Sequence, residues 1–203
     1  MTQSRRILIA IAVGLVALAA AGAPAHAEWI IVPPRAGQAG IAVEGQYGGL
    51  LKSGGVGRDF GNGPGLAVRL RYRMRYERGL GLSFESERFD ARSKSSEVTA
   101  QKFVTLYNYG FDVYQMFGTR TRTTRWLSAG LGLVQSRITL NDNEIQIPLS
   151  SDGAYVSGAA GVERFVWQSW AIDLSARYLT VFLDGKTNHD LQASLGLIVY
   201  ASY

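Results

Sequence analysis

Apolar and polar residues alternate along several segments of this chain, most clearly over residues 66–76. The even positions there are apolar or aromatic, whereas positions 69, 71, 73 and 75 are all arginine. A period of two places successive side chains on opposite faces of a β-strand. The segment therefore predicts a strand with one apolar face and one cationic face.

The same alternation, weaker in places, predicts further strands. In all we expect eight strands, at residues 41–51, 66–76, 80–87, 102–113, 126–140, 154–164, 170–178 and 191–203. Each is about long enough to cross a bilayer when tilted. The links after the first, third and fifth strands are long and polar, whereas those after the second and sixth are short. Such asymmetry is typical of outer-membrane barrels.

The first residues have the pattern of a secretory signal. Arg5 and Arg6 precede an unbroken apolar run over residues 7–22, and Ala25-His26-Ala27 has the small residues of a cleavage site. A single membrane-spanning anchor is the alternative, but the run is short for a span. The expected organisation is a signal peptide at 1–27, a periplasmic lead-in at 28–40 and a barrel at 41–203.

Composition narrows the function classes. The chain has no cysteine, so disulfides and thiolate metal sites are excluded. Of its 21 basic residues, Arg5 and Arg6 leave with the signal, so 19 remain against 16 acidic residues. That balance is too mild to indicate nucleic acid. Because no other apolar run reaches helix-spanning length, a mature chain that enters a membrane must form a closed barrel.

Taken together, the signal ending Ala25-His26-Ala27, the alternating strands and the final segment resemble the small eight-stranded outer-membrane β-barrels of the outer-membrane protein A and X type. The resemblance implies an all-β fold, an eight-stranded antiparallel up-and-down transmembrane barrel in the bacterial outer membrane. It also implies contact with outer-membrane lipids and lipopolysaccharide. The last strand resembles the signal that the outer-membrane assembly machinery reads, although it ends in tyrosine where phenylalanine is commoner; its residues are Leu197, Val199, Ala201 and Tyr203.

Aromatic residues are expected to gather at the end of the barrel that carries the short turns. Aromatic rings at such a rim match a membrane–water interface. The residues concerned are Tyr76, Tyr114, Phe117, Trp126, Trp167, Trp170 and Tyr203.

An eight-stranded barrel is just wide enough for its side chains to fill the lumen, so inward-pointing arginines need partners. If residues 77–79 form a three-residue turn, Arg71 lies opposite Glu85, and Arg69 lies opposite Glu87. The expected lumen charge network comprises Glu44, Arg69, Arg71, Arg73, Arg75, Glu85, Glu87, Asp112, Glu163, Asp173 and Arg177.

Two interpretations of this lumen compete. In the first, paired charges fill the barrel and hold its register, and the protein has a structural or surface-interaction role. In the second, the arginines line a narrow channel that prefers anions or passes small solutes. We favour the first because eight strands leave little open lumen.

Some barrels of this kind act on lipid A, so a lipid-modifying enzyme is a third alternative. A deacylase needs a serine activated by a base on the lipid-facing side. His189 is the one histidine after the signal, it lies just before the last strand, and Ser194 is expected to face inward. The sequence also has no metal-ligand cluster and no nucleotide fingerprint. We therefore predict no catalytic residue, no cofactor and no metal.

The loops opposite the short turns are the expected contact surface. Their basic residues could bridge lipopolysaccharide phosphates, although acidic residues are mixed among them. Asn141-Asp142-Asn143 is the predicted tip of a projecting hairpin within residues 136–149. Its arms would expose a strand edge able to pair with a surface protein partner, an adhesion-like role. The arm residues concerned are Ile138, Leu140, Ile145 and Ile147.

Overall fold

A computed structural model describes residues 36–51, 56–92, 101–142, 145–146 and 149–201. The predicted signal peptide at 1–27, most of the lead-in and Tyr203 lie outside these ranges. Among the described residues, no helix is long and apolar enough to cross a membrane.

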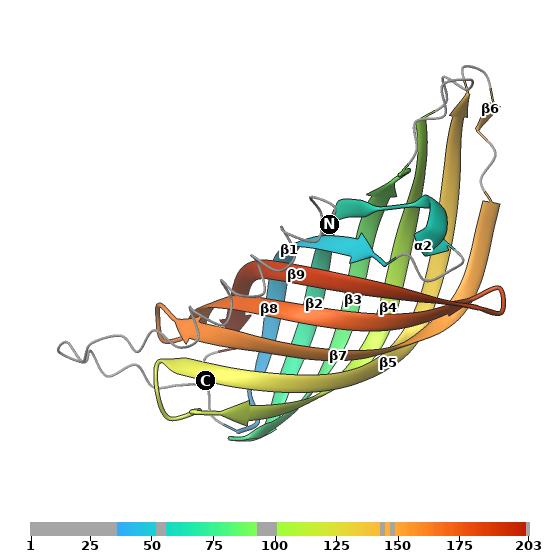
Figure 1. Ribbon diagram of the computed structural model, residues 1–203. Helices are drawn as coiled ribbons and strands as arrows, with labels where there is room; N and C mark the ends of the chain where they lie inside the picture. Colours follow the sequence, from blue (N-terminus) through green and yellow to red (C-terminus); the bar gives the residue numbers. More distant parts are fainter. Residues whose placement is uncertain (1–35, 52–55, 93–100, 143–144, 147–148, 202–203) are drawn as a thin grey trace, which may run out of the picture.

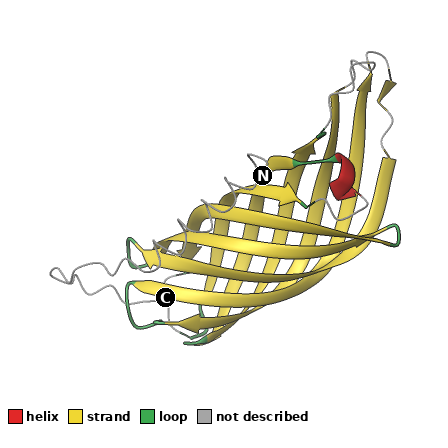
Figure 2. Ribbon diagram, viewed as in Figure 1, coloured by secondary structure: helices red, strands yellow, loops and turns green. Residues whose placement is uncertain are grey.

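Eight long strands form an antiparallel sheet that closes into a barrel (Figures 1 and 2). Long strands that follow one another in the sequence pair with each other; β5 pairs directly with β7, since β6 is only a short strand in the connection between them. β9 pairs with β1 and closes the barrel. The predicted up-and-down topology is therefore confirmed. The elements are β1 (Ala39–Leu50), α2 (Val56–Asp59), β2 (Asn62–Arg75), β3 (Arg78–Asp90), β4 (Gln101–Phe117), β5 (Thr123–Asp142), β6 (Ile145–Gln146), β7 (Leu149–Phe165), β8 (Trp170–Leu183) and β9 (Lys186–Tyr200).

Alternation along each strand separates an outer apolar face from a buried inner face. In β1, Ile41 and Val43 are exposed outward by about half of their surface, while Ala42 and Glu44 are completely buried inside. This is the reverse of a water-soluble barrel, since the outward side chains are apolar and the inward ones are frequently charged. Such a surface suits hydrocarbon.

The two ends of the barrel differ. We call one the short-turn end, because residues 76–77, 118–122 and 166–169 connect strands there. The other is the long-loop end, where residues 51–61 include α2 and where β4, β5 and β7 project furthest (Figure 1). The β8–β9 connection at the long-loop end is a two-residue turn, in which Asp184 and Gly185 both have positive φ, the geometry of a type I′ hairpin.

The predicted turn between β2 and β3 is wrong. Residues 76–77 form a two-residue turn, in place of the expected three-residue turn at 77–79. Together with a register shift between Arg73 and Arg75, this turn places Arg71 opposite Gly81 and not opposite Glu85. A slide by an even number of residues leaves every side chain on its face, so the apolar alternation does not distinguish the two registers.

Crowding inside the barrel supplies the physical reason for the observed register. Arg69 lies opposite Ser83, and not opposite Glu87 as predicted. The Tyr114 ring packs so closely over Gly81 that a Cβ there would lie 2.7 Å from its Cε2 atom. The small residues of β3 thus lie beside the long arginines of β2, which leaves room for both.

The aromatic rim is present, but two of its predicted members point inward. Trp167 and Trp170 are exposed at the short-turn end, by 74% and 47%. Tyr114 and Trp126, by contrast, are buried inside the barrel and contact each other edge to face, with ring centroids 5.4 Å apart. Trp126 shares the inward face of its strand with small residues, and the absence of a side chain at Gly161 leaves space for its ring.

In its described part the predicted hairpin is present, because Asn141 pairs with Gln146 and Asp142 with Ile145, whereas Asn143 and Ile147 lie outside the described residues. β5 pairs with β4 as far as Asn141, and on its other side it pairs with β7 and then β6. Ile138 packs against the buried apolar residues of the barrel and is not an exposed edge residue. The ladder between β7 and β8 begins only at Gly153, so within the described residues the start of β7 at 149–152 has no neighbouring strand on that side. β6, which carries Ile145, likewise pairs with β5 alone in the described part of the sheet.

The packing of Trp126 can be tested with two glycines of the same strand. Gly161→Ala is expected to destabilise the barrel by about 1–3 kcal/mol, because the new methyl group would overlap the Trp126 ring. Gly158→Ala is the matched control, since nothing lies within 4 Å of a Cβ there. Urea unfolding followed by the gel mobility of unboiled samples measures both; equal midpoints would contradict the inward position of Trp126.

Candidate functional site

The interior of the barrel is the best-defined candidate site, and it is filled in three layers. An aromatic layer lies nearest the short-turn end and contains Tyr114, Trp126, Phe165 and Tyr200. An ionic layer follows. Near the long-loop end lies an apolar cap, whose buried side chains are Leu50, Phe60, Phe89, Val104, Leu106, Val134, Tyr155, Leu179, Val181 and Leu183.

Arg69 joins two strands that flank its own. Its guanidinium lies 2.5 Å from Glu44 on β1 and 2.9 Å from Glu85 on β3. All three side chains are almost completely buried. A guanidinium is planar and carries five donors, so it can pair with two carboxylates at once. The arginine of β2 therefore links three adjacent strands through the lumen.

Arg177 extends this network across the barrel. It lies on β8 and reaches Glu85 on β3 and Asp112 on β4, each at 2.5 Å. A third donor contact, of 2.9 Å, goes to the hydroxyl of Ser157. Glu85 is therefore shared between Arg69 and Arg177, which extend into the lumen from β2 and β8, two strands separated by β1 and β9.

Arg71 and Arg73 connect the ionic layer to the aromatic layer. Arg71 lies 3.0 Å from Asp173 and 3.2 Å from Glu163, and Glu163 also lies 3.0 Å from Arg73. The Arg71 guanidinium sits 4.7 Å from the Tyr114 ring centre and 4.8 Å from that of Trp126. Aromatic faces attract cations, most strongly where water is excluded.

Arg73 makes an equivalent contact with a second pair of rings. Its guanidinium lies 5.0 Å from the ring centre of Tyr200 and 5.9 Å from that of Phe165. It also donates a hydrogen bond of 3.3 Å to the Tyr200 hydroxyl. The sequence analysis missed these rings as partners, although the alternation of β4, β5 and β9 already placed Tyr114, Trp126 and Tyr200 on the inward face.

Two predicted members of the charge network lie elsewhere. Arg75 is exposed beside the β2–β3 turn, where a register shift in the ladder ends the regular alternation. Glu87 is buried, but its carboxylate accepts a hydrogen bond of 2.7 Å from Gln192 and forms no ion pair among the described residues. Gln192 also donates to Asp190, at 3.0 Å. Asp190 was missed because the last strand was expected to begin one residue later.

The buried charges do not balance. Among the described residues, four arginines are buried in the lumen against seven carboxylates. An uncompensated buried charge is costly, so the carboxylates in excess need donors other than these arginines, as Glu87 and Asp190 have in Gln192. The arginines are Arg69, Arg71, Arg73 and Arg177, and the carboxylates belong to Glu44, Glu85, Glu87, Asp112, Glu163, Asp173 and Asp190.

The apolar cap is closed from above by the segment that contains α2. Phe60 follows this helix, is buried in the cap and forms a bridge with Ala91 beyond β3. The Arg92 guanidinium donates to the carbonyl oxygens of Phe60, at 2.6 Å, and of Leu50. Asn188 accepts a hydrogen bond of 3.1 Å from the backbone of Gly57 in α2. The segment is thereby attached to β1, β3 and β9.

The residues weighed for catalysis do not come together. His189 lies within β9 and not in the loop before it, and its Nδ1 atom is 2.7 Å from the Tyr178 hydroxyl. Ser194 points into the lumen, where its hydroxyl lies 2.6 Å from that of Ser175. The two candidates thus lie on opposite faces of the barrel wall. No group of three or more potential metal ligands occurs among the described residues.

Comparison with known families identifies the class of protein that this fold represents. Residues 13–198 match the family described as outer membrane protein beta-barrel domain. The chain belongs to this family and is a bacterial outer-membrane β-barrel. Comparison with curated proteins gave no match.

Solved structures agree with the fold. Neisserial surface protein A has a TM-score of 0.62 and 18% identity, with 79% of this chain and 96% of that one covered. Ail, the attachment invasion locus protein of Yersinia pestis, has a TM-score of 0.57 and 15% identity, with 82% and 99% covered. OprG from Pseudomonas aeruginosa has a TM-score of 0.54 and 13% identity, with 84% and 99% covered. At these identities the likeness shows the fold alone.

The register of the ionic layer can be tested by double-mutant cycles. Arg69→Met and Glu85→Gln are each expected to destabilise the barrel by about 3–5 kcal/mol, because each leaves a buried charged partner unpaired. Their coupling free energy should be about 2 kcal/mol, since the two side chains are in direct contact.

Arg71→Met with Glu85→Gln provides the matched control cycle. Arg71 pairs with Glu163 and Asp173 and not with Glu85, so the coupling should fall below about 0.5 kcal/mol. Urea unfolding in detergent measures both cycles. A larger coupling for Arg71 than for Arg69 would favour the three-residue turn over the observed one.

Proposed function

We propose that this protein is a structural outer-membrane barrel with a sealed lumen, which offers its long-loop end as a surface for interaction. The observation that carries the proposal is the continuous filling of the interior by buried aromatic, ionic and apolar layers. A wall held together by ion pairs across the lumen resists deformation, because separating one pair leaves two buried charges without partners.

A channel is the first competing function. Solute would have to pass the apolar cap and the shared carboxylate of Glu85, and both are buried. An anion preference finds no support in the lumen, where seven buried carboxylates outnumber four buried arginines. We therefore retain the sealed barrel over the anion-preferring channel that the arginine row suggested.

Enzymatic modification of lipid A is the second competing function. It finds no support in the positions of His189 and Ser194, because the wall of the barrel separates them. We propose no catalytic residue and no cofactor. Leu197 and Val199, on the outer face of β9, remain our proposed contacts for the assembly machinery, together with Ala201 and Tyr203.

Surface interaction is assigned to the projecting hairpin and the rim around it. The first residues of β7 have backbone groups without a neighbouring strand on the β8 side, and such an edge can accept a strand from another protein. Ail was solved with a heparin analogue, sucrose octasulfate. Here the described long-loop rim has five exposed basic and four exposed acidic residues, and this mixture favours a protein partner over a polysulfate.

The seal can be tested in planar bilayers. The parent protein is expected to give no steady conductance, because its cap is apolar and attached by Arg92. Arg92→Ala is expected to raise the frequency of brief openings at least about tenfold, since losing a charged hydrogen bond costs about 1.5–3 kcal/mol. Arg137→Ala, another exposed arginine at the same end, is the control. Stable, anion-selective pores in the parent would refute the sealed barrel.

The surface role can be tested by shortening the hairpin. Replacing residues 140–147 with Asn-Gly keeps the pairing of Ile138 with Leu149 and supplies a two-residue turn. The barrel should fold, as shown by its gel mobility before boiling, and attachment of protein-expressing bacteria to host or abiotic surfaces should drop to that of the empty strain. Attachment at the parent level would remove the hairpin from the proposal.

A further inference from the structure

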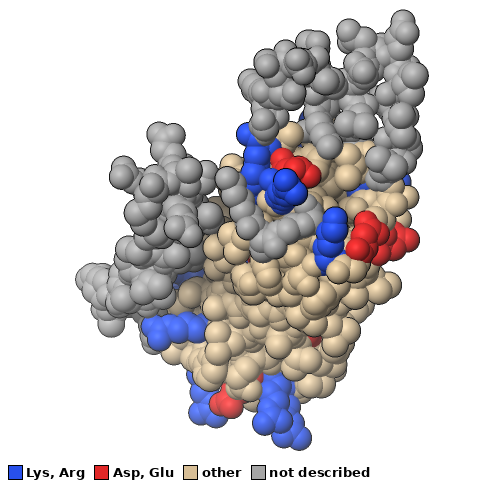
Figure 3. Space-filling view, turned by 45° about the vertical axis from the view of Figure 1, so that its right-hand side comes forward, with Lys and Arg blue, Asp and Glu red and all other residues tan. Residues whose placement is uncertain are grey.

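Exposed charge is distributed unequally between the two ends of the barrel. Outer-membrane barrels have their short turns on the periplasmic side, so the short-turn end is periplasmic. Figure 3 shows blue Lys and Arg side chains gathered at the lower end, below a tan band. Glu77 is the one exposed acidic residue described at this end. The exposed basic residues, which we call the arginine rim, are Arg75, Arg78, Arg120, Arg122, Arg125 and Arg164.

The arginine rim coincides with the exposed aromatic belt. Tyr76, Phe117, Trp167 and Trp170 are each exposed by 47% or more at the same end. Aromatic belts lie at the level of the lipid headgroups. The rim arginines therefore stand among the headgroups of the periplasmic leaflet, where phosphate is the abundant anion, and a guanidinium binds phosphate through two parallel hydrogen bonds.

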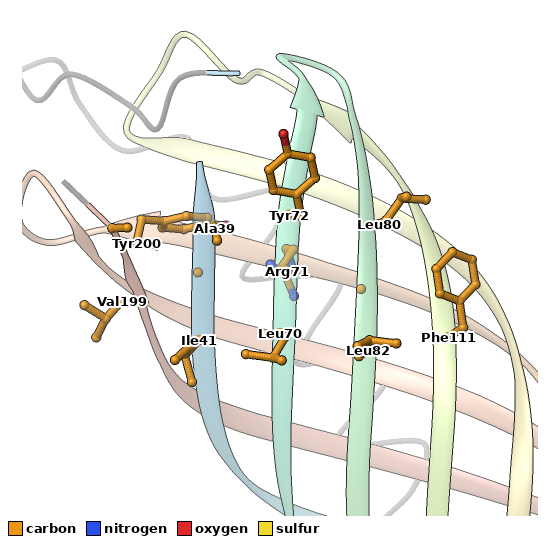
Figure 4. Close-up of a pocket in the computed structure, with 13 residues that line it drawn as sticks. Ala39, Ile41, Leu70, Arg71, Tyr72, Leu80, Leu82, Phe111, Val199 and Tyr200 are labelled. Atoms are coloured by element: carbon orange, nitrogen blue, oxygen red, sulfur yellow. The ribbon is translucent and has the colours of Figure 1, made fainter. Parts of the chain in front are cut away.

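An apolar groove lies on the outer face directly beside part of this rim. It has a volume of about 520 Å³ and follows β1, β2 and β3, with walls also from β4 and β9. Figure 4 shows Leu70 and Tyr72 from β2 between the side chains of the neighbouring strands. The remaining apolar walls include Ile41, Leu80, Leu82, Phe111 and Val199.

The groove ends close to two rim arginines. Tyr72 lies three residues before Arg75, and Leu80 lies two residues after Arg78, on the two arms of one hairpin. At about 3.3 Å per residue, both arginines start within about 10 Å of the groove. We propose that the groove and these two arginines form a binding site for an anionic phospholipid of the periplasmic leaflet, with an acyl chain in the groove and the phosphate at Arg75 and Arg78.

Charge and position favour this occupant over a periplasmic protein or a soluble anion. The groove faces the hydrocarbon layer, which a soluble ligand does not enter, and its lining is almost entirely apolar. A phospholipid has an apolar acyl chain that leads to a phosphate group. The site likewise has apolar walls that lead to two cationic side chains. Each basic residue at an anionic membrane surface strengthens binding by about fivefold.

Brominated lipids can test the site, because bromine quenches nearby tryptophan fluorescence. Trp170 pairs with Val199, a wall of the groove, and therefore reports on its occupant. In phosphatidylcholine vesicles, brominated phosphatidylglycerol is expected to quench with about tenfold higher apparent affinity than brominated phosphatidylcholine. Arg75→Gln combined with Arg78→Gln should reduce this preference to below about twofold.

A control variant with the same change in net charge distinguishes a specific binding site from nonspecific electrostatic attraction to the membrane. Arg137→Gln with Lys186→Gln removes two exposed cations from the long-loop end and should leave the preference unchanged. Equal loss in both double variants, or no preference in the parent protein, would overturn the proposal.

The groove itself is tested by filling it. Ile41→Phe with Leu70→Phe leaves the rim charges in place and is expected to weaken quenching by brominated lipid of either headgroup at least about threefold, since added ring volume displaces the chain. Unaltered quenching would show that the acyl chain does not bind in the groove and would overturn the proposal.

Discussion

The narrowness of an eight-stranded barrel is the constraint on which the rest of this structure depends. Such a lumen holds side chains and little else, so each inward group must find a protein partner. Arg69 shows the consequence, because it can remain buried only between Glu44 and Glu85. The requirement spreads: Glu85 then accepts Arg177, and small residues such as Gly81 must lie where an arginine or a tyrosine needs space. Charge pairing, the positions of the glycines and the strand register therefore depend on one another.

Alternation made the faces predictable from the sequence, whereas pairing depended on register. Each buried arginine of β2 has carboxylate partners drawn from the residues that alternation placed inside. The partner of a given arginine, however, changes with every slide of two residues, and no apolar pattern records such a slide. The turn at residues 76–77 and the register shift between Arg73 and Arg75 decide it, because together they place Arg71 opposite Gly81. The partners of Arg71 then come from β7 and β8, which are distant in sequence.

Other features lay within reach of the sequence but needed the end of each strand to be known. Asp190 has the inward parity of β9, yet it fell outside a strand expected to begin at residue 191. Tyr114 and Trp126 also occupy positions whose side chains alternation directs inward, and they are buried inside even though they lie near the end of the barrel. The apolar cap is different. Its members come from the ends of several strands and from Phe60 after α2, so only the closed barrel brings them together.

In the sealed barrel that we propose, contacts with other molecules fall to the outer surfaces, and the exposed charges differ between the two ends. Exposed acidic and basic residues are mixed at the long-loop end, where an edge of β7 has unpaired backbone groups. At the periplasmic end the exposed charges are almost all arginine, interleaved with aromatic rings. Burial inside the barrel requires each arginine to be paired with protein, as Arg73 is with Glu163. Two residues further along the same strand, Arg75 is free of that requirement, so its charge can be directed at the membrane instead.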